Sequence, residues 1–121
     1  LGILPSAGGV TRLVRAIGVA RAKELALLGE RFSAAEARGH GLVTEVVPDG
    51  EALPRALELA GRLAALPPLA VAVTKEAIEL SPDASREASL LIERLAYGLL
   101  AGTEDASEAT RAFVERREPR F

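Results

Sequence analysis

The stretch LGILPSAGGVTR, residues 1–12, decides how this chain is organised. Its apolar run ends at Pro5, which interrupts any regular strand ladder. The Ser-Ala-Gly-Gly segment that follows is typical of a tight turn, because adjacent glycines permit backbone conformations that other residues resist. From Val10 onward the apolar spacing becomes helical. We therefore expect a strand-like opening, a turn and a helix, with the opening forming one wall of a reaction site.

The composition bounds the class of protein. The chain has 121 residues, of which 49% are apolar and only 3% aromatic, so we expect a core of small and aliphatic side chains. The net charge of −2 argues against a nucleic-acid partner, which would need a basic stripe. No apolar run approaches the ~20 residues of a membrane span. The chain lacks Cys and a signal-peptide pattern, which favours a soluble, cytoplasmic protein.

Most of the chain is predicted to be helical. Gly18 and Gly29 are expected to end the first two helices, and Ser33 with Glu36 forms a capping box for a third. The helices are expected at about residues 10–17, 19–28, 34–38, 51–66, 69–80, 84–101 and 105–117. The helix at 84–101 is apolar on more than one face, which predicts a subunit or domain interface.

One strand is predicted besides the opening. Residues 42–47 are short and β-branched, and a Pro-Asp-Gly turn follows them. The fold class is therefore expected to be mostly α, with about six to seven helices and one short strand. Because the chain starts at Leu1 without an initiator Met, we expect it to be part of a larger protein.

The turn residues carry a functional and a structural interpretation. Ser6 as a nucleophile would need a base, but His40 is the one histidine and no G-x-S-x-G elbow is present, so we favour a turn role. Gly8 and Gly9 could bind phosphate at the helix N-terminus. The P-loop lysine and the G-x-G-x-x-G spacing are missing, so tight packing is favoured. The carboxylates at 104–108 fit helix capping better than a metal site.

Four segments in order resemble the C-terminal part of the enoyl-CoA hydratase/isomerase family, the crotonase superfamily. They are LGILPSAGGVTRL (1–13), GERFSAAEARGHGLVTEVVP (29–48), PPLAVAVTKEAI (67–78) and EDASEATRAFVERREPRF (104–121). The resemblance covers essentially the whole chain. It implies an α/β crotonase-like parent fold and an enzyme of fatty-acid metabolism that acts on acyl-CoA thioesters.

The resemblance also implies a mechanism. In the family, two backbone N–H groups stabilise a thioester enolate, and two glutamates handle water and proton in the hydratases. Those groups match positions before Leu1, so no catalytic residue is assigned within this chain. No metal or cofactor is implied, since CoA arrives with the substrate. Isomerase, dehydratase and other acyl-CoA lyase reactions stay open alternatives.

Three residues match substrate-binding positions of the family. Leu1 matches a residue that borders the acyl pocket, and Phe113 matches an aromatic residue that covers part of CoA. Ser6 matches a turn position whose backbone N–H faces the reacting water. The helical Lys75 also matches the family, without an assigned role, and the arginines at 116, 117 and 120 are read as a solvated helix end rather than a site for a CoA phosphate.

The resemblance divides the chain into three regions. Residues 1–17 would end the catalytic core, residues 18–66 would link it through helices and the short strand, and residues 67–121 would form a C-terminal oligomerisation region for trimers or hexamers. An alternative is that the chain alone is a catalytically silent oligomerisation or lid module.

Overall fold

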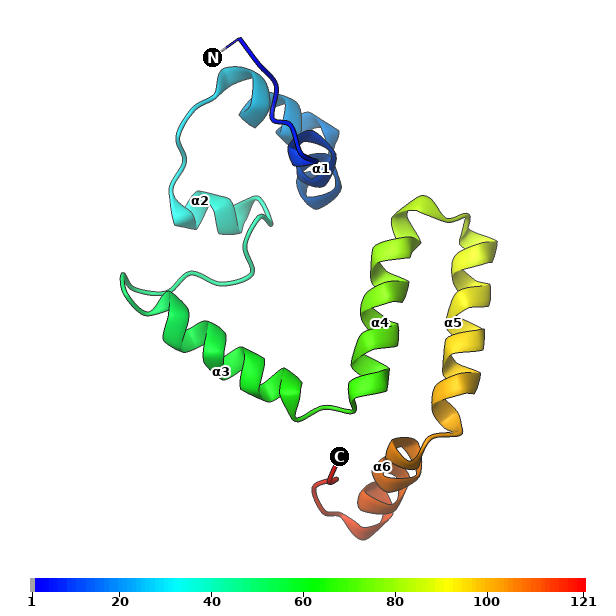
Figure 1. Ribbon diagram of the computed structural model, residues 1–121. Helices are drawn as coiled ribbons and strands as arrows, with labels where there is room; N and C mark the ends of the chain where they lie inside the picture. The colour runs from blue at the N-terminus through cyan, green and yellow to red at the C-terminus, as the bar shows by residue number, and fades with distance from the viewer. Residues whose placement is uncertain (1) are drawn as a thin grey trace. The chain divides into compact units, whose positions relative to one another are not determined.

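The computed structural model describes residues 2–121. Within that range the chain forms six α-helices and one short 3-10 helix, η1 (Figure 1). The element order is α1 (Gly9–Leu28), α2 (Ala34–Gly39), α3 (Ala52–Ala64), α4 (Pro68–Leu80), η1 (Ser81–Asp83), α5 (Arg86–Ala101) and α6 (Glu104–Glu115). The prediction of a mostly helical chain is confirmed.

The predicted strand at residues 42–47 is wrong, because residues 2–121 contain no β-ladder. The segment is irregular and lies between α2 and the turn in which the Glu51 N–H donates to the Pro48 carbonyl (3.0 Å). The Glu45 carboxylate accepts from the Arg55 Nε at 3.0 and 3.1 Å, which ties the segment to the start of α3. A β-branched run becomes a strand only beside another strand, and this part of the chain offers none.

The chain divides into two compact units, Leu1–Arg55 and Ala56–Phe121. The boundary falls inside α3, so each unit is described by itself. The three-region division expected from the sequence stays a prediction.

The first unit is organised by a break in α1. Gly18 has φ 77° and ψ 164°, which no helix accommodates, so α1 consists of two helical segments that meet at this residue. The sequence prediction that Gly18 ends one helix is confirmed. Gly29 then ends α1 in a left-handed conformation, with its N–H donating to the Leu25 carbonyl at 3.2 Å.

Local capping explains where the later helices begin. Ser33 and Glu36 form the predicted capping box at α2, with the Ser33 N–H donating to the Glu36 carboxylate at 2.7 Å. Thr103 Oγ1 accepts from the Ala106 N–H at 3.2 Å and caps α6. Ser85 caps α5 in the same way.

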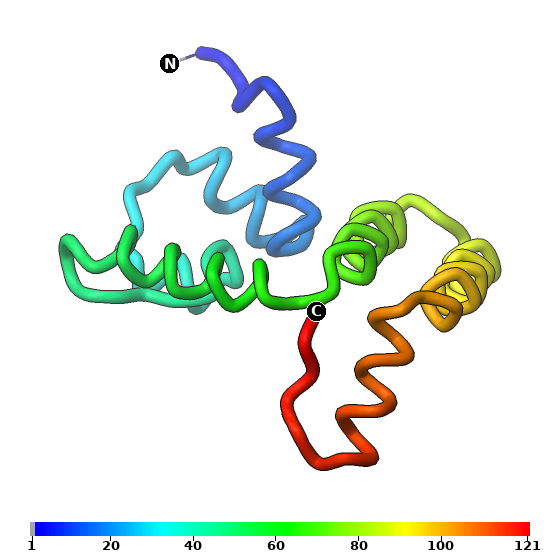
Figure 2. The backbone as a smooth tube through the Cα atoms, turned by 60° about the horizontal axis from the view of Figure 1, so that its bottom comes forward, coloured from blue at the N-terminus to red at the C-terminus, as the bar shows by residue number. Residues whose placement is uncertain are grey.

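The second unit is a helical hairpin with an additional helix. α4 packs on α5, and α6 contacts α5 (Figures 1 and 2). Pro68 lies in the first turn of α4, where its missing N–H costs no helical hydrogen bond. The hairpin positions α6 and the chain end after it.

Little of the described chain is buried. Among residues 2–121 only Ala22, Ala37 and Ala112 are buried, and every large apolar side chain retains solvent exposure. Leu27 is 80% exposed and Tyr97 is 76% exposed. Exposed apolar surface of this extent is typical of sites that contact another protein surface or a ligand, so we expect these faces to be contact surfaces.

Within residues 2–121, no single helix is long and apolar enough to cross a bilayer. The helices Ala52–Ala64 and Pro68–Asp83 reach that length and hydropathy only when they are taken together across a sharp bend.

Candidate functional site

A type I′ turn connects the opening segment to α1. The Gly9 N–H donates to the Ser6 carbonyl at 3.0 Å, and the two central residues, Ala7 and Gly8, have φ 55° and φ 85°. Such a turn needs positive φ at both central positions. Ala7 is therefore strained, because its Cβ disfavours the left-handed region.

Glycine is needed at positions 8 and 9 of the turn for two different structural reasons. Gly8 supplies the second positive φ, with the Arg12 side chain lying beside it. Gly9 is needed for space, because a Cβ at this position would lie 3.0 Å from the Cβ of Pro5. These observations support the predicted packing role of the Gly-Gly pair.

The structure places the three predicted substrate-binding residues differently. Leu1 lies outside the described residues. Ser6 is exposed in the turn, where its carbonyl is used by Gly9; within residues 2–121 its backbone N–H and its hydroxyl make no hydrogen bond. Phe113 lies on α6 in the second unit and is 85% exposed. No site is assigned between the two units.

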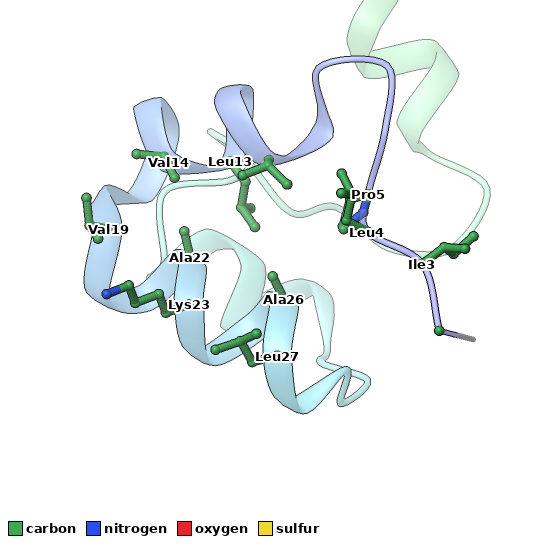
Figure 3. A pocket seen from close by; sticks show the side chains of 12 residues that line it. Ile3, Leu4, Pro5, Leu13, Val14, Val19, Ala22, Lys23, Ala26 and Leu27 are labelled. Atoms are coloured by element: carbon green, nitrogen blue, oxygen red, sulfur yellow. The ribbon is translucent and has the colours of Figure 1, made fainter.

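Pro5 and Val10, the residues on either side of the turn, line an apolar hollow of about 660 Å³ in the first unit, called here the N-terminal hollow (Figure 3). The opening segment forms one wall and the two segments of α1 form the others. Its described lining residues are Gly2, Ile3, Leu4, Pro5, Val10, Leu13, Val14, Val19, Ala22, Lys23, Ala26 and Leu27. Such a lining suits an acyl chain or another apolar protein surface.

Lys23 is the one charged residue among the described lining of the N-terminal hollow. Its aliphatic stem lies along the edge, and its nitrogen points away from Leu13 and Pro5 (Figure 3). Lysines commonly place the stem on apolar surface while the ammonium group stays in water. Lys23 therefore leaves the interior of the hollow apolar.

The nearby carboxylates serve helix structure. Glu24 pairs with Arg21 at 2.5 Å on the exposed side of α1. The pKa of Glu36 lies below its usual value, first because its carboxylate accepts from the Ser33 backbone N–H. His40 has its ring 6.3 Å from that of Phe32, in an edge-to-face arrangement. These contacts confirm the predicted capping role of Glu36 and place Glu24 on an exposed helix face.

The end of the chain contains an ionic cluster that the sequence interpretation missed. Glu108 was expected only to favour the α6 dipole, yet its carboxylate accepts from the Arg117 guanidinium at 2.5 Å. Arg117 also pairs with Glu115 at 2.5 Å, so it is engaged within the protein. The signal in the sequence is an acidic residue near the helix start and an arginine just beyond its end, but only the chain reversal brings them together.

The structure assigns no functional role to Lys75 and no metal-binding role to the carboxylates near the start of α6. Lys75 is exposed on α4 and no contact assigns it a function. Among residues 2–121, no group of three or more His, Cys, Asp or Glu side chains is arranged to hold a metal ion. The carboxylates near the start of α6 instead lie in its first turns, where negative charge favours the helix dipole.

Comparison with known proteins gives a consistent result. The family model "Enoyl-CoA hydratase/isomerase" matches residues 1–121. The chain is 41% identical over 121 residues to the 2,3-dehydroadipyl-CoA hydratase of Escherichia coli K12, covering 100% of this chain and 48% of that protein.

Two solved structures share the fold. An enoyl-CoA hydratase subunit I from Geobacillus kaustophilus has a TM-score of 0.94 and 42% identity, with 99% of this chain and 47% of that chain covered. An enoyl-CoA hydratase from Bacillus anthracis has a TM-score of 0.93 and 42% identity, with 99% of this chain and 46% of that chain covered. These structures support the crotonase-like parent fold.

The chain spans about half the length of the relatives that it matches. The covered fractions say how much of each relative the chain matches, and not which part of that relative. The placement of this chain as the C-terminal part of a larger protein therefore stays a prediction. The family match extends over every residue, and the fold is shared at more than 40% identity. The chain therefore belongs to the enoyl-CoA hydratase/isomerase family.

Proposed function

We propose that this chain is the helical part of an enzyme that adds water to the double bond of an enoyl-CoA thioester. The observation that carries the proposal is the family match over residues 1–121. The named activity of the E. coli relative, a hydratase of 2,3-dehydroadipyl-CoA, belongs to the same reaction class. Hydration in this family proceeds through charge on the thioester oxygen, and fixed N–H donors stabilise such charge.

The N-terminal hollow is proposed to contact the rest of the enzyme and the acyl part of the substrate. Its lining is apolar, and Leu27 and Ile3 are each 80% exposed within this chain. Burial of one such side chain contributes about 1.5–3 kcal/mol, so several together favour association strongly. The remaining part of the family fold is the occupant that this surface suits.

The Ser6 turn supplies one chemical group to that site. Its backbone N–H makes no hydrogen bond within residues 2–121. A free N–H of this kind can orient the reacting water, while the acids and oxyanion donors come from the rest of the enzyme. Phe113, exposed on α6, is proposed to contact the CoA moiety.

A second function, a catalytically silent oligomerisation and lid module, is favoured by the surface of the α4–α5 hairpin. Tyr97 and Leu95 of α5 and Ile78 of α4 are largely exposed and apolar. A trimer or hexamer would bury them. The two functions are compatible in a complete enzyme and separable in this chain.

Split-protein complementation tests the proposal. Residues 1–121 are co-expressed with the part of the E. coli 2,3-dehydroadipyl-CoA hydratase that this chain does not match, and each part is also expressed alone. Hydration is followed with crotonyl-CoA and with 2,3-dehydroadipyl-CoA, by the loss of absorbance of the conjugated thioester. We expect turnover from the pair and none from either part alone.

Each outcome has a distinct meaning. Turnover by residues 1–121 alone would contradict the placement of the acids and oxyanion donors outside this chain. A pair that associates on size-exclusion chromatography but converts neither thioester would contradict the hydratase proposal and leave the silent module. The matched control is the same E. coli part combined with its own natural remainder.

A further inference from the structure

The C-terminal strap, defined as residues 116–121, turns back along α6 instead of continuing the helix (Figures 1 and 2). The Arg116 N–H donates to the Phe113 carbonyl at 3.3 Å, and the Arg117 N–H donates to the Ala112 carbonyl at 3.0 Å. This pair of bonds is a Schellman motif, which reverses a chain at the end of a helix. The predicted helix end at residue 117 is therefore two residues too late.

The residue at which the chain reverses is an arginine, whereas the Schellman motif prefers glycine at this position. Arg116 has φ 54° and ψ 42°, a left-handed conformation usually occupied by glycine. For a residue with a side chain this conformation costs roughly 1–2 kcal/mol. Backbone preference alone therefore does not account for the folded strap.

Apolar burial also contributes little to holding the strap. Pro119 is partly exposed, and Phe121 at the chain end is 44% exposed. Ala112, on the helix side, is the one buried residue of α6. The interaction that compensates the strained turn must be polar.

Glu108 provides that interaction. Its Oε1 accepts from Arg117 Nη1 at 2.5 Å and from the backbone N–H of Arg120 at 3.0 Å. Its Oε2 accepts from Arg117 Nη2 at 3.1 Å and from Arg111 Nη2 at 3.2 Å. One carboxylate thus contacts the strap at a side chain and at the backbone three residues later.

We infer that the Glu108 carboxylate is a latch that holds the C-terminal strap against α6 and offsets the left-handed turn at Arg116. The two oxygens match the fork of the Arg117 guanidinium, and bidentate charge-assisted pairs are the strongest of their kind. Only 14% of the Glu108 side chain is exposed, so water competes weakly for these bonds. The inference is independent of the proposed function.

The surrounding charges keep the latch ionised. The pKa of Glu108 is lowered to about 2, chiefly by the hydrogen bond from the Arg117 side chain and then by the Arg120 backbone N–H. Arg111 lies beside it, and Glu115 shares Arg117. The carboxylate therefore stays charged across the neutral and mildly acidic range.

Limited trypsin digestion of the full chain tests the latch. The measurement is the rate of cleavage after Arg117 divided by the rate after Arg38 in the same molecule, both obtained by mass spectrometry. Global unfolding raises both rates, so the ratio reports local release of the strap. We expect Glu108→Gln to raise the ratio about tenfold, because an uncharged amide cannot replace the bidentate ion pair.

Two further variants make the test specific. Glu104→Gln removes the same charge from the same helix, and Glu104 makes no side-chain bond within residues 2–121, so we expect no change in the ratio. Arg116→Gly in the Glu108→Gln background should lower the ratio about threefold, since glycine favours the left-handed turn. An unchanged ratio in Glu108→Gln, or an equal rise in Glu104→Gln, would overturn the latch.

Discussion

Ala7, near the start of the chain, and Arg116, near its end, are the two non-glycine residues with positive φ in residues 2–121. Their φ values, 55° and 54°, are almost the same, and both lie where the chain reverses direction at a helix end. The turn at Ala7 precedes α1, and the turn at Arg116 follows α6. Their support within the chain is very different.

The turn at Ala7 is supported by one backbone hydrogen bond, from Gly9 to Ser6, and by close packing of Gly9 on Pro5. The turn at Arg116 is supported by the Glu108 cluster, which adds several charge-assisted bonds. Strained residues persist where the surrounding structure over-determines them. The chain itself thus supplies side-chain hydrogen bonds that support the turn at Arg116, whereas within residues 2–121 the turn at Ala7 has only backbone bonding and packing.

The largest expected effect is on the chemistry of the N-terminal turn. In the complemented enzyme, Ser6→Pro removes the backbone N–H and should lower the hydration rate by about 10²-fold, in the range found for loss of a preorganised donor. Ser6→Ala keeps the N–H and should leave the rate within about twofold. The measurement is kcat with crotonyl-CoA, with association checked by size-exclusion chromatography. Equal losses in both variants would show that the hydroxyl matters instead.

The next effect concerns association through the N-terminal hollow. Leu27→Asp places a charge on its apolar lining and should weaken binding to the complementary part by at least about tenfold, since leucine burial contributes about 1.5–3 kcal/mol. Glu24→Gln changes the charged face of the same helix and should have little effect. Titration calorimetry or a binding assay with the two purified parts measures the dissociation constants. Similar losses in both variants would argue against the hollow as the contact surface.

A smaller effect is expected from relieving the two strained turns. Ala7→Gly and Arg116→Gly should each raise the free energy of unfolding of the complemented protein by about 1 kcal/mol, because a left-handed residue with a Cβ costs roughly 1–2 kcal/mol and glycine flexibility returns part of it. Denaturant unfolding measures both. A destabilising Ala7→Gly would mean that the Ala7 methyl group makes contacts outside this chain.

The smallest effect is the pH dependence of the C-terminal turn. Because the pKa of Glu108 is lowered from 4.5 to about 2, its contribution is complete above pH 4.5 and is lost as the pH falls through about 2. The strap should thus remain folded at pH 4, where most exposed glutamates are partly protonated. Carbon-13 NMR titration of the Glu108 carboxyl checks this value. A titration near 4.5 would contradict the latch.

Local patterns were predicted well from the sequence because their causes are local. Ser33 and Glu36 lie three residues apart and form a capping box in any helix that starts there. Gly18 breaks α1 because its own φ and ψ are non-helical. The segment at 42–47 was mispredicted because strand formation needs a neighbouring strand, which residue type cannot supply.

The sequence by itself determined the helical class, the helix starts, the turn at residues 6–9 and the family of the chain. These follow from spacing, caps, glycines and motifs that act over a few residues. Only the tertiary structure showed that Ala7 is strained, that Lys23 points out of an apolar hollow, and that Glu108 meets Arg117. The physical reason is that each depends on the path of the chain in space, which brings together groups that no local pattern links.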